Sequence, residues 1–214
     1  MGQSIHLAKT EVPGSIWAFE HAGDSAHTAV QTWITARQNI SPKRLVEPGP
    51  SLDQIDRLFN AAASAPDHGQ IIPWRFVIIP AEKRAQLAEV FALALLDRDP
   101  GASLAQIEAA REKAHRAPLL VLAVARLGKE DNNIPEAERL VSLGCAIQNI
   151  LLSALATGFG SGLTSGQAMD SAQMRAMFAL TSGEAAVCFV NVGSVSKSKP
   201  ARERPLPERF LTVL

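Results

Sequence analysis

The spacing of apolar residues predicts several helices along the chain. Two early stretches repeat apolar residues every three to four positions, which places them on one helix face. The first predicted helix runs from about residue 24 to 37, and the residues expected to face the core are Ala29, Val30, Trp33 and Ile34. The second starts at Ser51 as N-cap and stops before Pro66, with a stripe of Leu52, Ile55, Leu58, Phe59 and Ala62. Further helices are expected at about 81–97, 103–115, 136–157 and 170–178.

Short apolar runs without helical spacing predict four strands. They are Trp74–Ile79, Pro118–Ala125, a stretch near Ser161–Thr164, and Ala185–Val192. The second run reads PLLVLAVA and is apolar at successive positions. A strand of this kind is covered on both faces, as in a sheet between two helix layers. The last residues, RFLTVL, are also typical of a strand.

The N-terminal segment differs from the remainder of the chain. Residues 1–23 contain Pro13, Gly14 and Gly23 as helix breakers and no sustained apolar stretch, so they predict an irregular arm without a signal peptide. The chain has 214 residues, which favours one core. We therefore expect one domain over residues 24–214.

The predicted helix at 136–157 is apolar on nearly every face in its second half. Such a helix is either the axis of the core or part of a subunit interface. Its apolar stretch, 143–156, is interrupted by Gln148 and Asn149 and is too short to cross a bilayer. A protein that does not enter the membrane and forms a homodimer is expected from these features.

Composition narrows the classes of function. Lys plus Arg and Asp plus Glu both number 21, so no net charge favours nucleic acid or an anionic membrane. The two cysteines, Cys145 and Cys188, lie in apolar runs without metal-ligand spacing, and the histidines are scattered. We expect no metal site, and the cysteine usage fits a reducing cytoplasm.

Three segments carry residues suited to chemistry. Arg37, Gln38 and Asn39 end the first predicted helix, where they either grip a phosphate or form a solvated helix end. The loop APDHGQ places Asp67 and His68 directly before a buried strand. These two side chains either face a ligand or satisfy each other or a helix end.

The third segment, GFGSG at 158–162, is a helix cap and a tight turn. It is not a dinucleotide fingerprint, because its glycines follow a helix and precede a strand. No nucleophile elbow or Ser-His-Asp order stands out either. A chain without an obvious side-chain catalyst is typical of an enzyme whose organic cofactor carries the chemistry.

Taken in order, these segments resemble the bacterial nitroreductase family. That family has an Arg-Arg-Ser type triplet after its first helix, matched by Arg37, Gln38 and Asn39. Its Ala-Pro-(Ser/Asp)-(Ser/His) loop and Pro-Trp-Arg/His-Phe strand are matched by AAASAPDHGQIIPWRFVII. The APDH form is similar to a compact subgroup of NAD(P)H nitroreductases. The resemblance covers residues 25–214, and later matches are RAPLLVLAVA, SLGCAIQNILLSALATGFGSG and RPLPERF.

This resemblance implies an α+β fold of three layers, α/β/α, around a mostly antiparallel or mixed sheet, with a domain-swapped C-terminal strand. It also implies FMN bound at a homodimer interface. NADH or NADPH would pass hydride to FMN, and a nitroaromatic, quinone or similar small acceptor would then take it, in a ping-pong cycle. The alternatives are a non-catalytic flavin-binding sensor or carrier, and a flavin enzyme of this fold acting on another metabolite.

The resemblance also implies which residues contact FMN, while FMN itself carries the chemistry. The residues at the ribityl phosphate and ring edge would be Arg37, Gln38 and Asn39. The residues supplied by the partner chain, or lining the same site, would be Ser64, Pro66, Asp67 and His68. Those behind the isoalloxazine would be Gly162, Leu163 and Thr164, and Arg202 and Arg204 would approach the phosphate. Gln38 and Ser64 stand where relatives carry arginine, so two phosphate charges are missing.

Overall fold

The computed structural model describes residues 23–128, 133–198, 200 and 202–214, so the predicted arm lies, but for Gly23, outside the described residues. The helices are α1 (Gly23–Ala36), α2 (Leu52–Ala63), α3 (Arg84–Arg98), α4 (Leu104–Arg111), α5 (Glu136–Ala156) and α6 (Ala172–Met177). The strands are β1 (Leu45–Val46), β2 (Trp74–Ile78), β3 (Leu119–Arg126), β4 (Gly160–Thr164) and β5 (Glu184–Val195). The helix expected over 103–115 is divided into α4 and a 3-10 turn at Glu112–His115, and β1 is an addition to the prediction.

Local sequence explains where several helices begin. Ser51 and Gln54 form a capping box at the start of α2, and Ser103 and Gln106 form another at α4. In each box the serine hydroxyl accepts from a backbone amide of the first turn, and the glutamine side chain accepts from the serine amide. These pairs satisfy amides that have no partner inside the helix.

All strand pairs of the sheet are antiparallel, and the order is β1-β5-β3-β2, with β4 also paired to β5. The longest strand, β5, has 12 residues and lies at the centre, where β3 lies along one edge. Its other edge pairs with β4 from Phe189 to Gly193 and with β1 at residues 194 and 195. After α5 the chain passes through residues 157–159 into β4, which contains residues 160–162 of the predicted glycine turn.

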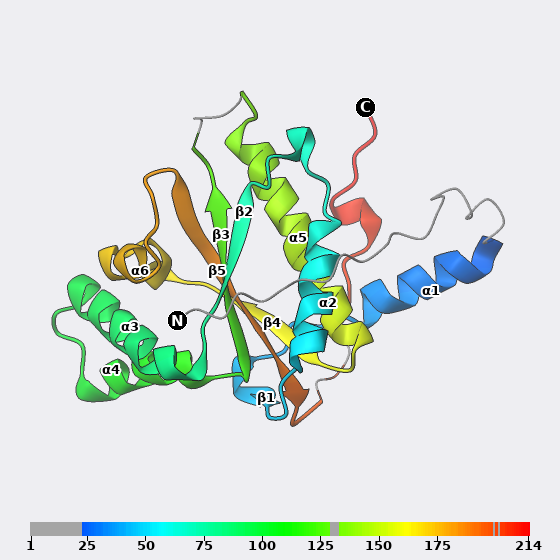
Figure 1. Ribbon diagram of the computed structural model, residues 1–214. Coiled ribbons are helices and arrows are strands. Elements are labelled where there is room, and N and C mark those ends of the chain that lie inside the picture. The colour runs from blue at the N-terminus through cyan, green and yellow to red at the C-terminus, as the bar shows by residue number, and fades with distance from the viewer. Residues whose placement is uncertain (1–22, 129–132, 199, 201) are drawn as a thin grey trace.

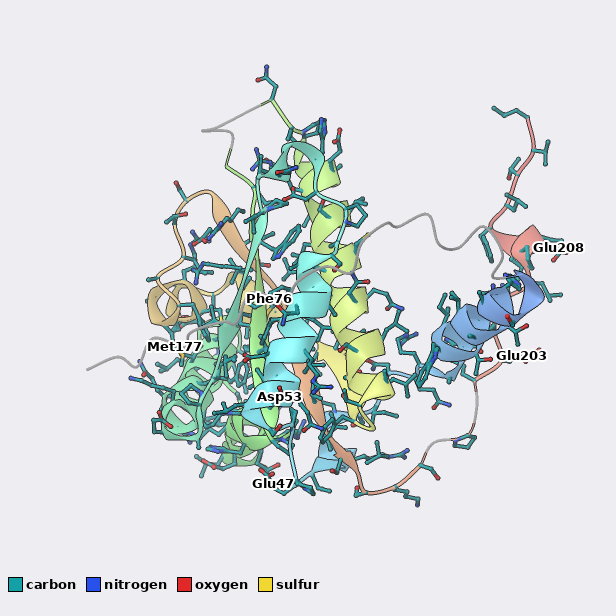
Figure 2. All side chains as sticks on the ribbon, turned by 45° about the vertical axis from the view of Figure 1, so that its right-hand side comes forward. Glu47, Asp53, Phe76, Met177, Glu203 and Glu208 are labelled. Atoms are coloured by element: carbon teal, nitrogen blue, oxygen red, sulfur yellow. The ribbon has the colours of Figure 1, made fainter. Side chains whose placement is uncertain are left out.

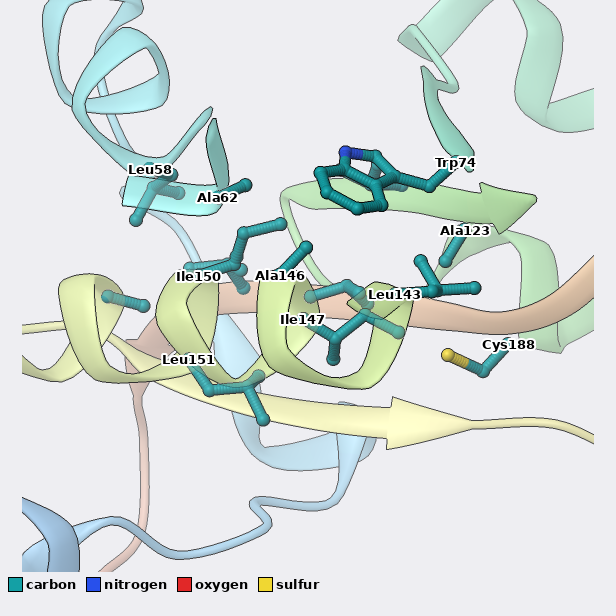
Figure 3. Close-up of a cluster of buried hydrophobic side chains, with 14 of the residues drawn as sticks. Leu58, Ala62, Trp74, Ala123, Leu143, Ala146, Ile147, Ile150, Leu151 and Cys188 are labelled. Carbon is teal, nitrogen blue, oxygen red and sulfur yellow. The ribbon is translucent and has the colours of Figure 1, made fainter. Parts of the chain in front are cut away.

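Two cores on opposite faces of the sheet define three layers (Figure 1). One lies between the sheet and the α2–α5 pair, and Figure 3 shows Leu58 of α2, Trp74 of β2 and Leu143 of α5 meeting there. The other joins the sheet to α3 and α6 through residues such as Leu87, Leu122 and Met174. The predicted α+β fold with an α/β/α arrangement is confirmed.

The helix α5 is a core helix. It has 21 residues and is long and apolar enough to cross a membrane by length and composition alone. Eight of its residues are nevertheless buried, including Leu143, Ile147 and Ile150, and α2 and the sheet cover them. The large apolar side chains of α5 that remain exposed are Leu140 and Val141, near its start.

The first helix and the C-terminal segment lie at the side of the layers (Figures 1 and 2). We call residues 23–37 and 202–214 together the arm, which is distinct from the N-terminal segment 1–22. The prediction that Val30, Trp33 and Ile34 face the core is wrong, because these side chains are 56%, 47% and 44% exposed. Their spacing does form an apolar helix face, but it borders an open groove beside α2 and α5 instead of packing into the core. The helical pattern alone does not show what lies opposite such a face.

The C-terminal strand is also not formed in the single chain. Pro207–Arg209 is a 3-10 turn, and residues 211–214 have no regular structure. A strand needs a partner for its backbone groups, and none of the described strands pairs with these residues. Exchange of this segment between two copies stays a prediction.

Candidate functional site

Two arginines lie at the end of α1, where the Arg204 side chain contacts the Arg37 backbone, and we call this pair the arginine corner. The side chain of Arg204 donates from Nη2 to the carbonyl of Arg37 at 2.8 Å and to that of Thr35 at 3.4 Å. The Nε atom of Arg37 is buried and has no hydrogen-bond partner. No carboxylate of the described residues forms an ion pair with either arginine. Both arginines therefore lack a carboxylate partner in the described part of the chain, and Arg37 has an unused N–H donor. Such a pair favours the binding of an anion.

The next residues connect α1 to β4. The Asn39 side chain accepts from the Leu163 amide at 2.7 Å, and the Ile40 amide donates to the Ser161 carbonyl at 2.8 Å. A Cβ atom on Gly162 would lie 2.1 Å from the Ile40 carbonyl oxygen, so only glycine permits this close approach. Two of the predicted segments, 37–39 and 162–164, are thus brought together.

A buried asparagine holds the end of β4. Asn191 of β5 is 2% exposed, and its Nδ2 donates to the Gly162 carbonyl and to Thr164 Oγ1, both at 3.1 Å. Because the amide bonds to both, it fixes the orientation of Thr164. Asn191 was not among the predicted site residues, although a single amide within the apolar run AAVCFVNV indicates a buried polar role.

Thr164 and Asn191 line a cavity of about 630 Å³ beside α3 and α4. This volume is in the range of small-molecule sites. Its floor is apolar and includes Phe91 and Phe189, whose rings are 5.7 Å apart. Pro42, close in sequence to Asn39, also lines it, so the cavity adjoins the segments described above.

The predicted loop at Pro66–His68 lies elsewhere in the chain. The Asp67 carboxylate accepts from the amides of Ile72 at 2.7 Å and Ile71 at 3.3 Å. His68 Nδ1 lies 2.8 Å from Glu138 Oε2 in the first turn of α5. Within one chain Asp67 therefore accepts hydrogen bonds from loop amides, and His68 contacts a carboxylate in the first turn of α5. The two side chains do not bond to each other.

The loop and the arginine corner are far apart in one chain. His68 contacts the start of α5, whereas β4 and Asn39 lie beyond its end. A helix of 21 residues is about 30 Å long, since each residue adds roughly 1.5 Å. Asp67 and His68 cannot reach the Arg37 corner of their own chain.

The remaining predicted residues have simpler surroundings. Ser64 lies at the end of α2 and lines a groove of about 490 Å³ between α1 and the α2–α5 pair, with Trp33 and Asn149. Gln38 is half-buried, and Pro66 and Arg202 are exposed. Within the described residues no group of three or more His, Cys, Asp or Glu side chains could hold a metal ion. Burial raises the pKa of the Cys188 thiol to about 11, so it stays protonated at neutral pH.

The arginine corner fits a phosphate-bearing planar cofactor. The free donor of Arg37 and the neighbouring Arg204 supply positive charge for a phosphate. The Asn39–Leu163 contact and the missing side chain of Gly162 bring residues 39 and 40 close against β4, and the cavity follows at Thr164. This arrangement suits a ligand with an anionic end and an aromatic end.

Comparison with known proteins shows which family the sequence matches. The model of the nitroreductase family matches residues 41–194. The protein of Haemophilus influenzae named "Putative NAD(P)H nitroreductase" is 31% identical over 163 residues, which cover 76% of this chain and 86% of that protein. The Escherichia coli protein of the same name, YdjA, is 31% identical over 173 residues, covering 80% of this chain and 93% of its own length.

Solved structures share the fold. A nitroreductase-like family protein from Bacillus cereus has a TM-score of 0.75 at 17% identity, over 86% of this chain and 95% of that one. A nitroreductase with bound FMN from Bacteroides fragilis has a TM-score of 0.64 at 20% identity, over 86% of this chain and 98% of that one. At these identities the similarity concerns the fold.

Proposed function

The chain belongs to the nitroreductase family of oxidoreductases, and from this premise we propose that it is an FMN-dependent NAD(P)H oxidoreductase. In this proposal residues 24–214 act as one FMN-binding domain. The observation that carries the proposal is the arginine corner, where Arg37 keeps a buried donor without a partner beside Arg204. The FMN-bound relative and the NAD(P)H-named relatives support the choice of cofactor and donor.

Arg37 and Arg204 would hold the FMN phosphate. A phosphate near −2 charge is best bound by charged donors, and the chain has glutamine at position 38 and serine at position 64. Arg204 would replace part of the missing positive charge, because its hydrogen bond of 2.8 Å to the Arg37 carbonyl holds its guanidinium group at the end of α1. Gln38 and Asn39 would contact the ribityl chain and ring edge, and Arg202 would approach the phosphate from the exposed tail.

Gly162, Leu163 and Thr164 would lie behind the isoalloxazine. Pairing with β5 fixes the backbone of β4, which would serve as a wall behind the ring system. Asn191 would keep that wall in place through its bonds to the Gly162 carbonyl and Thr164. When bound, FMN supplies two-electron chemistry, accepting hydride from NAD(P)H and passing electrons to a second substrate.

A second copy of the chain would complete the site. Asp67 and His68 lie a helix length from the arginine corner, so only a partner chain can bring them to the same flavin. The exposed face of Val30, Trp33 and Ile34 and the unpaired C-terminal segment provide apolar surface for such a homodimer. A dimer has a mass of about 46 kDa, twice the chain mass of 22.9 kDa, by light scattering.

Reduction of a nitro group provides a balanced test reaction. NADPH or NADH gives two electrons and one proton as hydride, and solvent gives a second proton. The nitro group becomes a nitroso group and one oxygen leaves as water. The side chains position the reactants and exclude water, and no side chain forms a covalent bond in this scheme.

The visible spectrum of the purified protein tests the proposal. We expect a yellow protein with a flavin spectrum, which NADPH or NADH bleaches under nitrogen and a nitrofuran or menadione restores. Steady oxidation of NAD(P)H with these acceptors excludes a sensor or carrier, whose flavin would bind without turnover. A colourless protein that takes up no added FMN would refute the proposal.

A further inference from the structure

The cavity beside α3 and α4 combines an apolar floor with a basic rim. The floor includes Phe91, Phe189 and Leu120. The rim includes three cations, Arg98, Lys113 and Arg116, and no aspartate or glutamate of the described residues lines the cavity. A ligand that matches both parts has an aromatic body and a negative charge.

These rim charges are largely uncompensated. Arg98 and Lys113 form no ion pair with a carboxylate in the described part of the chain, and Arg116 approaches one only at 3.9 Å, at the exposed Glu112. Clefts lined by one sign of charge attract ligands of the opposite sign. The overall charge balance of the protein conceals this local excess.

A buried arginine holds two of the rim cations in place. Arg84 is 7% exposed and donates to the carbonyls of Ala114 at 2.9 Å and Pro118 at 3.1 Å, with a longer contact to that of Arg116. Because these carbonyls belong to the segment that carries Lys113 and Arg116, the rim is positioned before any ligand arrives. Burial lowers the pKa of Arg84, which forms no ion pair with a carboxylate among the described residues.

The cavity shares a wall with the proposed flavin site. Thr164 lines the cavity and ends the strand placed behind the isoalloxazine, and Asn191 bonds to it from the cavity floor. A molecule in the cavity would therefore lie next to Thr164, at the end of the strand that borders the proposed flavin site. The FMN phosphate is assigned to Arg37 and Arg204 and leaves the rim cations free.

We propose that this cavity binds the electron acceptor and selects a planar aromatic acceptor that carries a carboxylate, held by Arg98 and Lys113. This inference rests on the proposed function. The apolar floor covers the aromatic ring, and inorganic phosphate would leave that floor uncovered. The exposed position of Arg98 limits the size of the effect, because solvent and salt screen such charges.

Matched charged and neutral ligands test this inference in the protein as purified. Binding of benzoate and benzamide is measured by calorimetry, and kcat/KM is measured for 4-nitrobenzoate and 4-nitrobenzamide. We expect about a tenfold preference for the carboxylate in both measurements, as for one charged hydrogen bond. Arg98→Gln reduces this preference to about twofold, and rising salt reduces it in the wild type.

Two further variants complete the design. Lys113→Gln provides a second rim substitution, and Arg57→Gln is the control, since Arg57 pairs with Asp53 on the exposed face of α2, away from the cavity. The control keeps the full preference. Equal binding of benzoate and benzamide, or a preference retained in both rim variants, overturns the inference while flavin reduction by NAD(P)H still supports the proposed function.

Other outcomes are equally decisive. If Arg98→Gln raises KM for NADPH but not for NADH and leaves the benzoate preference intact, the rim binds a nucleotide phosphate and the inference is wrong. If the protein takes up no FMN yet prefers benzoate, and Arg98→Gln removes that preference, the proposed function fails and the anion-selective cavity is supported.

Discussion

The three-layer body is made of α2–α6 and β1–β5. The body and the arm differ in how much of their apolar surface is buried and in how many of their charged groups have partners within the chain. In the body the sheet is covered by helices on both faces, and several of its charged groups have partners. Arg75, for example, binds Glu184 through two bonds of 2.6 and 3.0 Å. In the arm Trp33 and Phe210 are 47% and 71% exposed, and Arg37 keeps a buried donor without a partner.

This contrast indicates that the body determines the stability of the fold and that the arm contributes to ligand binding. The match to the nitroreductase family model spans residues 41–194, which is the body, while Arg37 and Arg204 lie outside it. The body has the contacts that a stable fold needs. The arm carries apolar and cationic surface that its own chain leaves unused, which is what a cofactor and a second copy would occupy. Changes in the body should therefore affect stability, and changes in the arm should affect flavin binding.

The largest expected effect is on the body. Leu122 of β3 is completely buried in the core beside α3 and α6. We expect Leu122→Ala to lower the free energy of unfolding by about 3–4 kcal/mol, because it removes buried methyl groups and leaves a cavity. Urea denaturation followed by circular dichroism measures this change. The control is Leu93→Ala on α3, where leucine is 46% exposed and the expected loss is under about 1 kcal/mol. Similar losses for both variants would contradict a well-packed core at Leu122.

The body was largely predictable because its elements follow local rules. The apolar run at 118–125 lies in the centre of the sheet, and Ser51 caps α2 as expected. The arm was not, because the spacing of Val30, Trp33 and Ile34 defines a helix face without specifying what covers it. The C-terminal strand stays a prediction for a similar reason, since strand propensity cannot supply the pairing partner that a single chain lacks.

The candidate site shows the same limits. The segments at 37–39 and 162–164 were singled out separately from the sequence, and the structure brings them into contact through Asn39 and Leu163. The rim cations and Arg84 were missed, because they lie in helices and turns whose meeting depends on tertiary packing. A basic residue at a buried helical position, such as Arg84, is a usable signal only once the buried face of α3 is known.

The next effect is on the arm. We expect Arg37→Met to weaken FMN binding about 10- to 100-fold, since a lost charged hydrogen bond is worth roughly 1.5–3 kcal/mol. Arg204 should stay in place, because it binds the Arg37 carbonyl rather than the side chain. The stability of the flavin-free protein should not fall, because the substitution also removes a buried donor without a partner. Fluorescence titration with FMN measures the affinity, and urea denaturation of the flavin-free protein measures the stability.

Arg57→Met is the matched control for this variant, because it removes an exposed arginine of the body that pairs only with its helix neighbour Asp53. It should leave FMN affinity unchanged. If Arg37→Met instead destabilised the flavin-free protein and bound FMN normally, the arm would be a structural element and the contrast with the body would be lost.

The smallest expected effect concerns an ion pair inside the body and depends on pH. The hydrogen bonds from Arg75 hold the pKa of Glu184 below its usual value, and the Thr181 amide adds to this. Since the folded pKa lies below the unfolded value of about 4.3, the stabilisation is complete above about pH 5. It is lost as pH falls through the folded pKa, because the unfolded chain then binds the proton more readily.

Glu184→Gln should therefore lower the free energy of unfolding by about 1 kcal/mol at pH 7, and the difference should shrink as pH falls toward about 3.5. Urea denaturation at pH 7, 5 and 3.5 measures this difference. The Glu89→Gln control removes an exposed carboxylate, paired with Arg111, that should add little at any pH. FMN affinity should stay unchanged in both variants, because Glu184 lies in the body and far along β5 from the strand end that meets β1. A loss of FMN binding in Glu184→Gln would show that the body and the arm are coupled more tightly than their separate contacts indicate.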